Sequence, residues 1–173
     1  MDVPQGLTLE DSRDLAGRER RPIVRRVLVA LLALFLVLGL FNVFGQQVSV
    51  DSGEGSAARL EVSAPTKLRG GLFFQARYRI VAIDEIENAT IVLDPGWVED
   101  ITLNTVEPSP VGEASRDGRI ALELGRVPAG EEHLLYLHFQ VNPTALGPQS
   151  QDVDLYDGER LLVSLDRAAL IWP

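Results

Sequence analysis

The chain of 173 residues contains no cysteine. That absence excludes a disulfide framework, thiolate zinc sites and cysteine nucleophiles. Lysine is nearly absent too, since Lys67 is the only one beside fifteen arginines, and there are only two histidines. The formal net charge of -9 argues against general nucleic-acid binding. A domain without disulfides depends on its apolar core, for which about 120 residues are sufficient.

Charge is distributed unevenly along the chain. Residues 1–26 carry six arginines against five acidic residues, a net charge of +1, so the remainder carries -10. Such a difference between two segments indicates two environments. Residues 1–22 are polar with a few scattered leucines, and we predict that they form a disordered cytoplasmic tail.

One long apolar run follows the tail. Between Val27 and Gly45 the only polar side chain is that of Asn42. A helix of this length spans about 28 Å, close to the roughly 30 Å hydrocarbon core of a bilayer, so we predict a transmembrane helix over residues 23–45. Five arginines near its start set the topology: Arg18, Arg20, Arg21, Arg25 and Arg26. By the positive-inside rule they place the N-terminus in the cytoplasm and the C-terminal domain outside the plasma membrane.

A cleaved signal peptide is the main alternative to a retained anchor. Val43 and Gly45 would fill the small-residue positions before a cut at Gln46. The apolar run is at the upper limit for a signal peptide, and the polar tail before it is long for one. These two features favour a retained anchor, but the alternative stays open.

Beyond the apolar run the sequence changes its period. Residues 46–57, "QQVSVDSGEGSA", are rich in serine, glycine and acid, and we predict a flexible linker there. In residues 58–173 apolar side chains recur at every second position, most clearly in "GGLFFQARYRIVAI" and "EEHLLYLHFQVNP". About eight such strands between turn signals are typical of an antiparallel sandwich. The expected fold class is all-β, a single antiparallel immunoglobulin-like β-sandwich preceded by one transmembrane α-helix.

The segment "QDVDLYDGERLLVSLD" predicts a hairpin, whose register depends on the turn. A three-residue loop over Tyr156–Gly158 pairs Val153 with Leu161 and keeps the apolar residues of both strands on one face. It also places Gly158 where a left-handed backbone is required.

Two longer runs, "GGLFFQARYRIVAIDEIENATIVLDPGW" and "LGRVPAGEEHLLYLHFQVNPTALG", invite comparison with a known family. Their alternating strands and their "P-G" and "PAG" turns resemble bacterial extracytoplasmic immunoglobulin-like modules of the conserved-repeat or CARDB type. The resemblance covers residues 58–165 and implies a spacer, adhesive or binding unit. It brings no catalytic residues with it.

No constellation of residues predicts an enzyme, a cofactor or a metal site. His133 and His138 are five apart on one expected strand, so they face opposite sides and cannot share a metal. "DVDLYDGE" has the look of a calcium loop, but its third acid comes one place late for an EF-hand, and the hairpin accounts for Asp157 and Gly158 without a metal. Weak calcium binding by these acidic loops stays open.

The outward side of two expected strands carries apolar residues. If these strands are neighbours, their exposed apolar side chains mark a partner surface, whose residues are Phe73, Val81, Ile83, Leu134, Tyr136 and His138. We therefore expect a non-enzymatic tethering or protein-interaction module that acts on another membrane or envelope protein. A ligand-binding or sensor module of the cell envelope, with the helix as signal anchor, is the alternative.

Overall fold

The computed structural model describes residues 21–41, 43 and 45–172, and the chain divides into two compact units, Met1–Gly45 and Gln46–Pro173. The first unit contains helix α1, which begins at Arg21 and ends at Leu40. The helix therefore starts two residues earlier and ends five residues earlier than predicted. Most of the expected tail, including Arg18 and Arg20, lies outside the described residues.

Apolar side chains are exposed all around α1, since the consecutive residues Val27, Leu28 and Val29, which point in different directions, are each more than half exposed. A helix that is apolar on every side suits a lipid environment. The stretch Pro22–Leu40 is long and apolar enough to cross a membrane, and a signal sequence near the N-terminus has the same properties. The anchor and the cleaved signal therefore both stay open.

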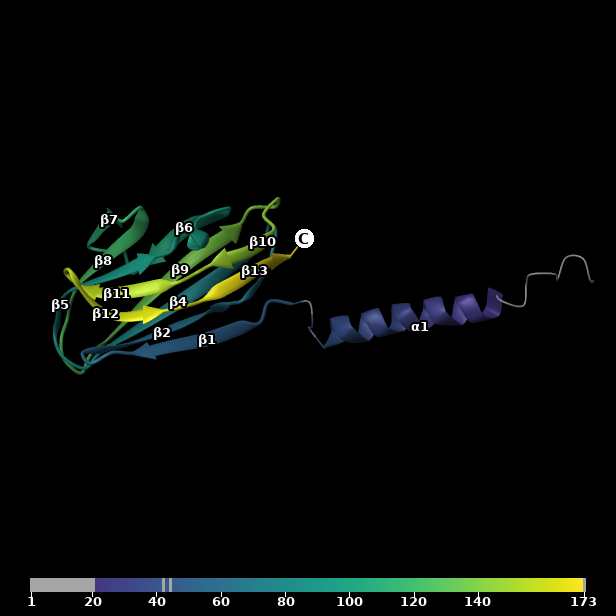
Figure 1. Ribbon diagram of the computed structural model, residues 1–173, viewed down its shortest axis with the longest axis horizontal. Helices are drawn as coiled ribbons and strands as arrows, with labels where there is room; N and C mark the ends of the chain where they lie inside the picture. The colour runs from purple at the N-terminus through teal and green to yellow at the C-terminus, as the bar shows by residue number, and fades with distance from the viewer. Residues whose placement is uncertain (1–20, 42, 44, 173) are drawn as a thin grey trace, which may run out of the picture. The chain divides into compact units, whose positions relative to one another are not determined.

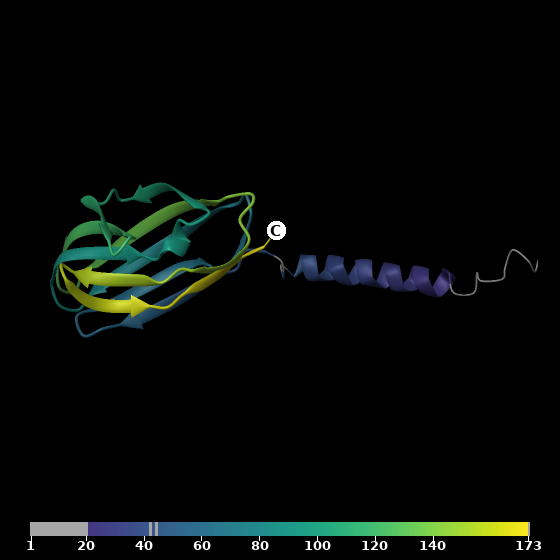
Figure 2. The same cartoon turned by 45° about the horizontal axis from the view of Figure 1, so that its top comes forward.

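The second unit is a β-sandwich (Figures 1 and 2). Sheet A has the strand order β1 (Val48–Glu54), β2 (Ala58–Pro65), β4 (Phe73–Ala82), β9 (Glu132–Val141) and β6 (Ile101–Glu107). Sheet C has the order β12 (Arg160–Leu165), β11 (Val153–Asp157), β5 (Ile86–Leu93), β8 (Arg119–Val127) and β7 (Gly112–Arg116). The small sheet B consists of β10 (Gly147–Ser150), β13 (Ala168–Trp172) and β3 (Lys67–Arg69).

These sheets confirm the predicted fold class, with one apolar helix before an antiparallel sandwich. One pair departs from it, because β13 and β3 run parallel. Most of the expected strands are present. The sequence interpretation missed the short strands β3, β7 and β10, although the Asp117-Gly118 dipeptide directly after β7 is a strong hairpin signal. Both of these residues have positive φ, 52° and 77°, as a two-residue hairpin turn requires.

The core lies between sheets A and C and arises from the alternation of each strand. Its largest fully buried side chains are Trp97, Tyr78, Phe139, Leu60, Leu68, Ile80, Ile86, Ile91, Leu93, Leu122, Leu135 and Leu137. Trp97 belongs to the short 3-10 helix η1 (Pro95–Trp97). Its ring lies 5.5 Å from that of Phe139 and 5.6 Å from that of Tyr78, centroid to centroid. Each large side chain buried here contributes about 1.5–3 kcal/mol, which is how a chain without disulfides holds this fold.

The linker expected over residues 46–57 is wrong, because most of it forms strand β1. This strand pairs with β2 along its whole length, from Val48 opposite Pro65 to Glu54 opposite Arg59. Gly53 in this strand and Gly55 directly after it serve close packing. A Cβ atom at Gly53 would lie 2.9 Å from side-chain atoms of β12, and one at Gly55 would collide with the carbonyl oxygen of Leu162.

The loop expected at Tyr156–Gly158 is also wrong. The turn between β11 and β12 contains only Gly158 and Glu159, and Leu162 has no partner between two adjacent pairs of the hairpin. This extra residue is a β-bulge, and it shifts the side-chain parity of the strand. As a result Leu161, expected on the apolar face, is 51% exposed. Gly158 does adopt the left-handed conformation that the sequence predicts, with φ of +56°.

Candidate partner-binding face

The outer face of sheet A, turned away from the core, is where the sequence predicts a partner surface. That surface requires β4 and β9 to be neighbours. They are, since they pair from Phe73 opposite Gln140 to Val81 opposite Glu132. The predicted residues of both strands occupy outward positions, because the positions between them are buried.

The six predicted residues do not form one apolar patch. Leu134, Tyr136 and His138 follow one another along the outer side of β9 as a half-buried stripe. Phe73 and Ile83 are 67% and 46% exposed. They lie at opposite ends of β4, ten residues apart, which corresponds to about 33 Å in a strand. The structure thus brings the β9 residues together and leaves these two far from each other.

Polar side chains of β4 lie directly beside the stripe. Gln75 is opposite His138, Arg77 opposite Tyr136 and Arg79 opposite Leu134. The Nε2 atoms of Gln75 and His138 are 3.2 Å apart. The outer face is therefore an apolar stripe bordered by amides and guanidinium groups rather than a continuous hydrophobic surface.

Ion pairs cross this face between neighbouring strands. Arg79 donates to Glu132 of β9 at 2.6 Å, and Arg59 of β2 donates to Glu54 of β1 at 2.5 Å. The hydrogen bond from Arg79 to Glu132, together with the negative charge of that carboxylate, raises the pKa of Arg79. Both pairs are about half exposed, so their contribution to stability is small.

Arg77 is the residue of this face that the sequence interpretation missed. Its side chain is 43% exposed, and its ion pair with Glu61 is long, at 3.5 Å. Its Nε atom is buried without a hydrogen-bond partner. Arginine and tyrosine are the residue types that interface hot spots favour, and here a partly exposed arginine lies opposite Tyr136. Strand alternation could have identified Arg77, but the interpretation selected only apolar residues.

The two histidines face opposite sides of β9, as the sequence predicts. His133 lies on the inner side, opposite Ile80, and burial lowers its pKa. His138 lies on the outer side and contacts Gln75. Within the described part of the chain, no hydrogen bond joins either histidine to a serine, and no group of three or more histidine and acidic side chains is arranged to hold a metal ion.

The acidic loop that looks like a calcium site is occupied by internal hydrogen bonds. Asp154 accepts from Arg119 at 2.7 Å and from Ser164 at 2.6 Å. The hydrogen bond to Asp154 raises the pKa of Arg119. Asp157 accepts from the backbone N–H of Asn88 at 3.0 Å. These carboxylates therefore join strands and turns of sheet C.

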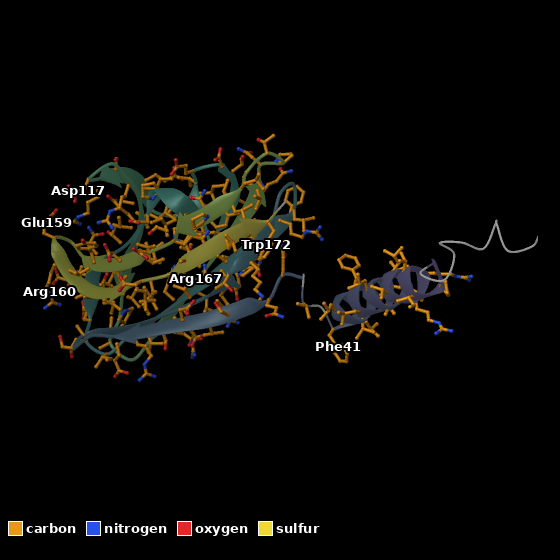
Figure 3. The ribbon with its side chains drawn as sticks, turned by 45° about the vertical axis from the view of Figure 1, so that its right-hand side comes forward. Phe41, Asp117, Glu159, Arg160, Arg167 and Trp172 are labelled. Atoms are coloured by element: carbon orange, nitrogen blue, oxygen red, sulfur yellow. The ribbon has the colours of Figure 1, made fainter. Side chains whose placement is uncertain are left out.

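A second polar cluster is buried at the sandwich edge around Arg167 (Figure 3). The guanidinium donates to Asp51 Oδ2 at 2.9 Å, to Gln151 Oε1 at 2.6 Å and to the Ala64 carbonyl at 2.5 Å. It also lies 5.4 Å from the centre of the Trp97 ring. Because Asp51 belongs to β1, this cluster fixes the first strand to the C-terminal part of the domain. No sequence pattern predicts it.

Comparison with known proteins identifies no family for this chain. Neither the protein-family models nor the curated proteins contain a match. Among solved structures, the cohesin CaCohA2 from Clostridium acetobutylicum is 14% identical, with a TM-score of 0.46 over 68% of this chain and 92% of that one. A non-cellulosomal cohesin from the archaeon Archaeoglobus fulgidus is 13% identical, with a TM-score of 0.42 over 73% and 92%.

A β-glucosidase from Listeria innocua is 15% identical, with a TM-score of 0.33 over 69% of this chain and 16% of the enzyme. None of these similarities assigns a function.

Proposed function

We propose that this protein is a single-pass, non-enzymatic tether of the plasma membrane whose extracytoplasmic β-sandwich binds another membrane or envelope protein. In this proposal α1 is retained in the bilayer and the arginines at its start keep the N-terminus in the cytoplasm. Arg25 and Arg26 lie in the first turns of α1, and no arginine lies in its later part.

The connection between helix and sandwich is short. Helix α1 ends at Leu40 and β1 begins at Val48, so seven residues lie between them and reach at most about 24 Å. A tether this short keeps the sandwich next to the bilayer and raises its effective concentration at a membrane-bound partner.

The observation that carries the proposal is the stripe of Leu134, Tyr136 and His138 with Arg77 beside it. Interface cores are enriched in aromatic side chains and arginine. Half-buried Tyr136 offers a large, rigid contact area, and Arg77 offers a guanidinium that is 43% exposed and only loosely held by its 3.5 Å ion pair with Glu61. The net charge of -10 beyond residue 26 suits a partner with a basic surface.

Site-specific photo-crosslinking in native membranes tests this proposal. A photoreactive amino acid replaces Tyr136 in the full chain, and the control replaces Ala114, which is exposed on the edge strand β7 of sheet C. We expect a discrete crosslinked product from position 136 and none from position 114. Arg77→Ala in the chain labelled at position 136 should reduce the product at least tenfold, which corresponds to a hot spot of about 1.4 kcal/mol or more.

Equal labelling from both positions would contradict the proposal, because it indicates random encounters. If neither position yields a product and a sugar or a metal ion raises the melting temperature of the full chain, the ligand-binding or sensor function replaces the tethering function.

A further inference from the structure

One end of the sandwich carries a cluster of exposed apolar side chains that lies apart from the stripe of Leu134, Tyr136 and His138, although it includes Phe73 of the predicted partner surface. We name it the apolar tip, and its members are Leu72, Phe73, Leu146, Leu170 and Trp172. Their exposed fractions range from 39% for Leu170 to 67% for Phe73, and Trp172 is 48% exposed. Exposed apolar side chains gathered in one place mark a contact surface, whereas single ones do not.

The backbone pairing brings these residues together from distant parts of the sequence. Leu170 and Trp172 lie on β13, opposite Lys67 and Arg69 of β3. The Leu72 N–H donates to the Arg69 carbonyl at 3.3 Å. Leu146 comes directly before β10, whose Gly147 pairs with β13. Figure 3 shows Trp172 at this end, with Glu159 and Arg160 at the other.

The apolar tip is also the end at which the chain from α1 enters the sandwich. The Thr66 N–H, next to Lys67, donates to the Gln47 carbonyl at 3.4 Å. Figures 1 and 2 show the C-terminal strand finishing at this same end of the sandwich. Because only seven residues connect α1 to β1, the start of β1, at the same end as the tip, can lie at most about 24 Å from the end of the helix.

Charge distinguishes this end from the rest of the domain. The described sandwich contains nine arginines, and all except Arg69 have a carboxylate partner within 4.0 Å. These eight are Arg59, Arg77, Arg79, Arg116, Arg119, Arg126, Arg160 and Arg167. Within residues 46–172, Lys67 and Arg69 are the two cations that form no ion pair there, and both lie at the tip. Asp100 also lies at this end, because its carbonyl accepts from the Asn142 N–H at 2.9 Å and the adjacent Pro143 lies against Gly70, but it forms no ion pair with Lys67 or Arg69.

We propose that the apolar tip rests in the headgroup region of the bilayer leaflet on the sandwich side. Trp172 enters the interface, where tryptophan is enriched, the apolar Phe73 and Leu146 enter beside it, and Lys67 and Arg69 contact lipid phosphates. This inference rests on the proposed membrane anchoring. Since the tip lies at the ends of the strands, such contact holds sheet A upright and turns the Tyr136 stripe sideways, toward other proteins of the same membrane.

Tryptophan fluorescence of the full chain in proteoliposomes tests this contact. The chain contains two tryptophans, of which Trp97 is fully buried and Trp172 is exposed. Lipids brominated near the headgroup should quench Trp172 and leave Trp97 unaffected. We expect quenching in the natural chain and none in Trp172→Phe, whose remaining emission also reports whether the core is intact. Quenching that is absent from the natural chain, or that persists in Trp172→Phe, overturns the inference.

Substitution of the unpaired cations provides the second measurement. In vesicles with anionic lipids, Lys67→Gln with Arg69→Gln should weaken tip contact by about fivefold per side chain, seen as reduced Trp172 quenching. Arg126→Gln with Arg160→Gln is the matched control, because it also removes two cations and both side chains are exposed at the opposite end of the sandwich. Equal effects of both changes contradict the proposed contact.

Alkaline extraction of the same vesicles separates the two proposals. A chain that stays in the membrane without Trp172 quenching overturns the tip contact and leaves the anchor intact. A chain that alkali releases overturns the anchor and, with it, the tip contact.

Discussion

Replacement of Arg167 by methionine should weaken the whole sandwich and release β1 in particular. The Arg167 side chain is 1% exposed and donates to acceptors on three separate segments, at Asp51, Gln151 and Ala64. Methionine has a comparable length but donates no hydrogen bond. The change therefore leaves the Ala64 carbonyl and the Gln151 amide oxygen, both in buried residues, without this donor.

The magnitude follows from the burial of the partners. Removing one member of a buried charge pair costs about 3–5 kcal/mol. Asp51 is 37% exposed and can regain water, so we expect a loss near the lower limit, about 3 kcal/mol. That is a large share of the roughly 5–15 kcal/mol that stabilises an ordinary domain, and it should lower the melting temperature by about 10 °C.

Chemical denaturation of the full chain in detergent measures this loss. Trp97 emission follows the core when Trp172→Phe removes the second tryptophan. Arg59→Met is the matched control, because both members of its ion pair with Glu54 are 55% exposed, and its expected cost is within about 1 kcal/mol. A loss for Arg167→Met no greater than that of the control would refute the account of a desolvated guanidinium.

Hydrogen exchange adds a local readout to the same variant. If Asp51 is held by Arg167, the amides of β1 should exchange faster in Arg167→Met while those of β4 keep most of their protection. Uniform acceleration across both strands would show that Arg167 does not hold β1 specifically.

Other substitutions test the packing and titration described above. Gly55→Ala forces a Cβ atom into the Leu162 carbonyl and should destabilise the sandwich by about 1–3 kcal/mol. Ser56→Ala, exposed in the same turn, should leave the free energy of unfolding unchanged in the same denaturation assay. Equal free energies of unfolding for the two variants would contradict the close approach of Gly55 to Leu162. Because burial lowers the pKa of His133 below its ordinary 6.5, the unfolded chain binds more protons below that pH. Stability should therefore be fully present above pH 6.5 and fall as the pH decreases through the folded-state pKa. His133→Gln should remove this loss of stability at low pH, and His138→Gln should retain it. If stability depends on pH in His133→Gln as it does in the natural chain, His133 is not the group responsible.

Strand alternation predicted much of the fold because one face of each long strand is buried. In β4 and β9 every second residue is in the core, and a period of two is hard to produce otherwise. The same pattern placed Tyr136 and His138 on the outer side. It could not decide whether they form a patch, since that depends on the residues paired across from them, such as Arg77.

Composition misled the interpretation where glycine serves packing rather than flexibility. Gly53 and Gly55 occur in a segment of serine and acid that resembles a linker, and only the approach of β12 shows why side chains are excluded there. The β-bulge at Leu162 is similar, because one unpaired residue shifts the register without any signal in the local sequence. The role of Arg167 could not be predicted either, because its hydrogen-bond partners lie up to 116 residues away in the sequence.

The state of the mature chain in the membrane tests the central claim most directly. Cells carrying the chain with a C-terminal reporter are treated with external protease, and their membranes are then extracted with alkali. The account predicts an intact chain of 19.0 kDa plus reporter that resists alkaline extraction and loses its sandwich to protease added outside. A mature chain that begins at Gln46 and is released from the membrane, or a sandwich protected inside intact cells, would contradict it.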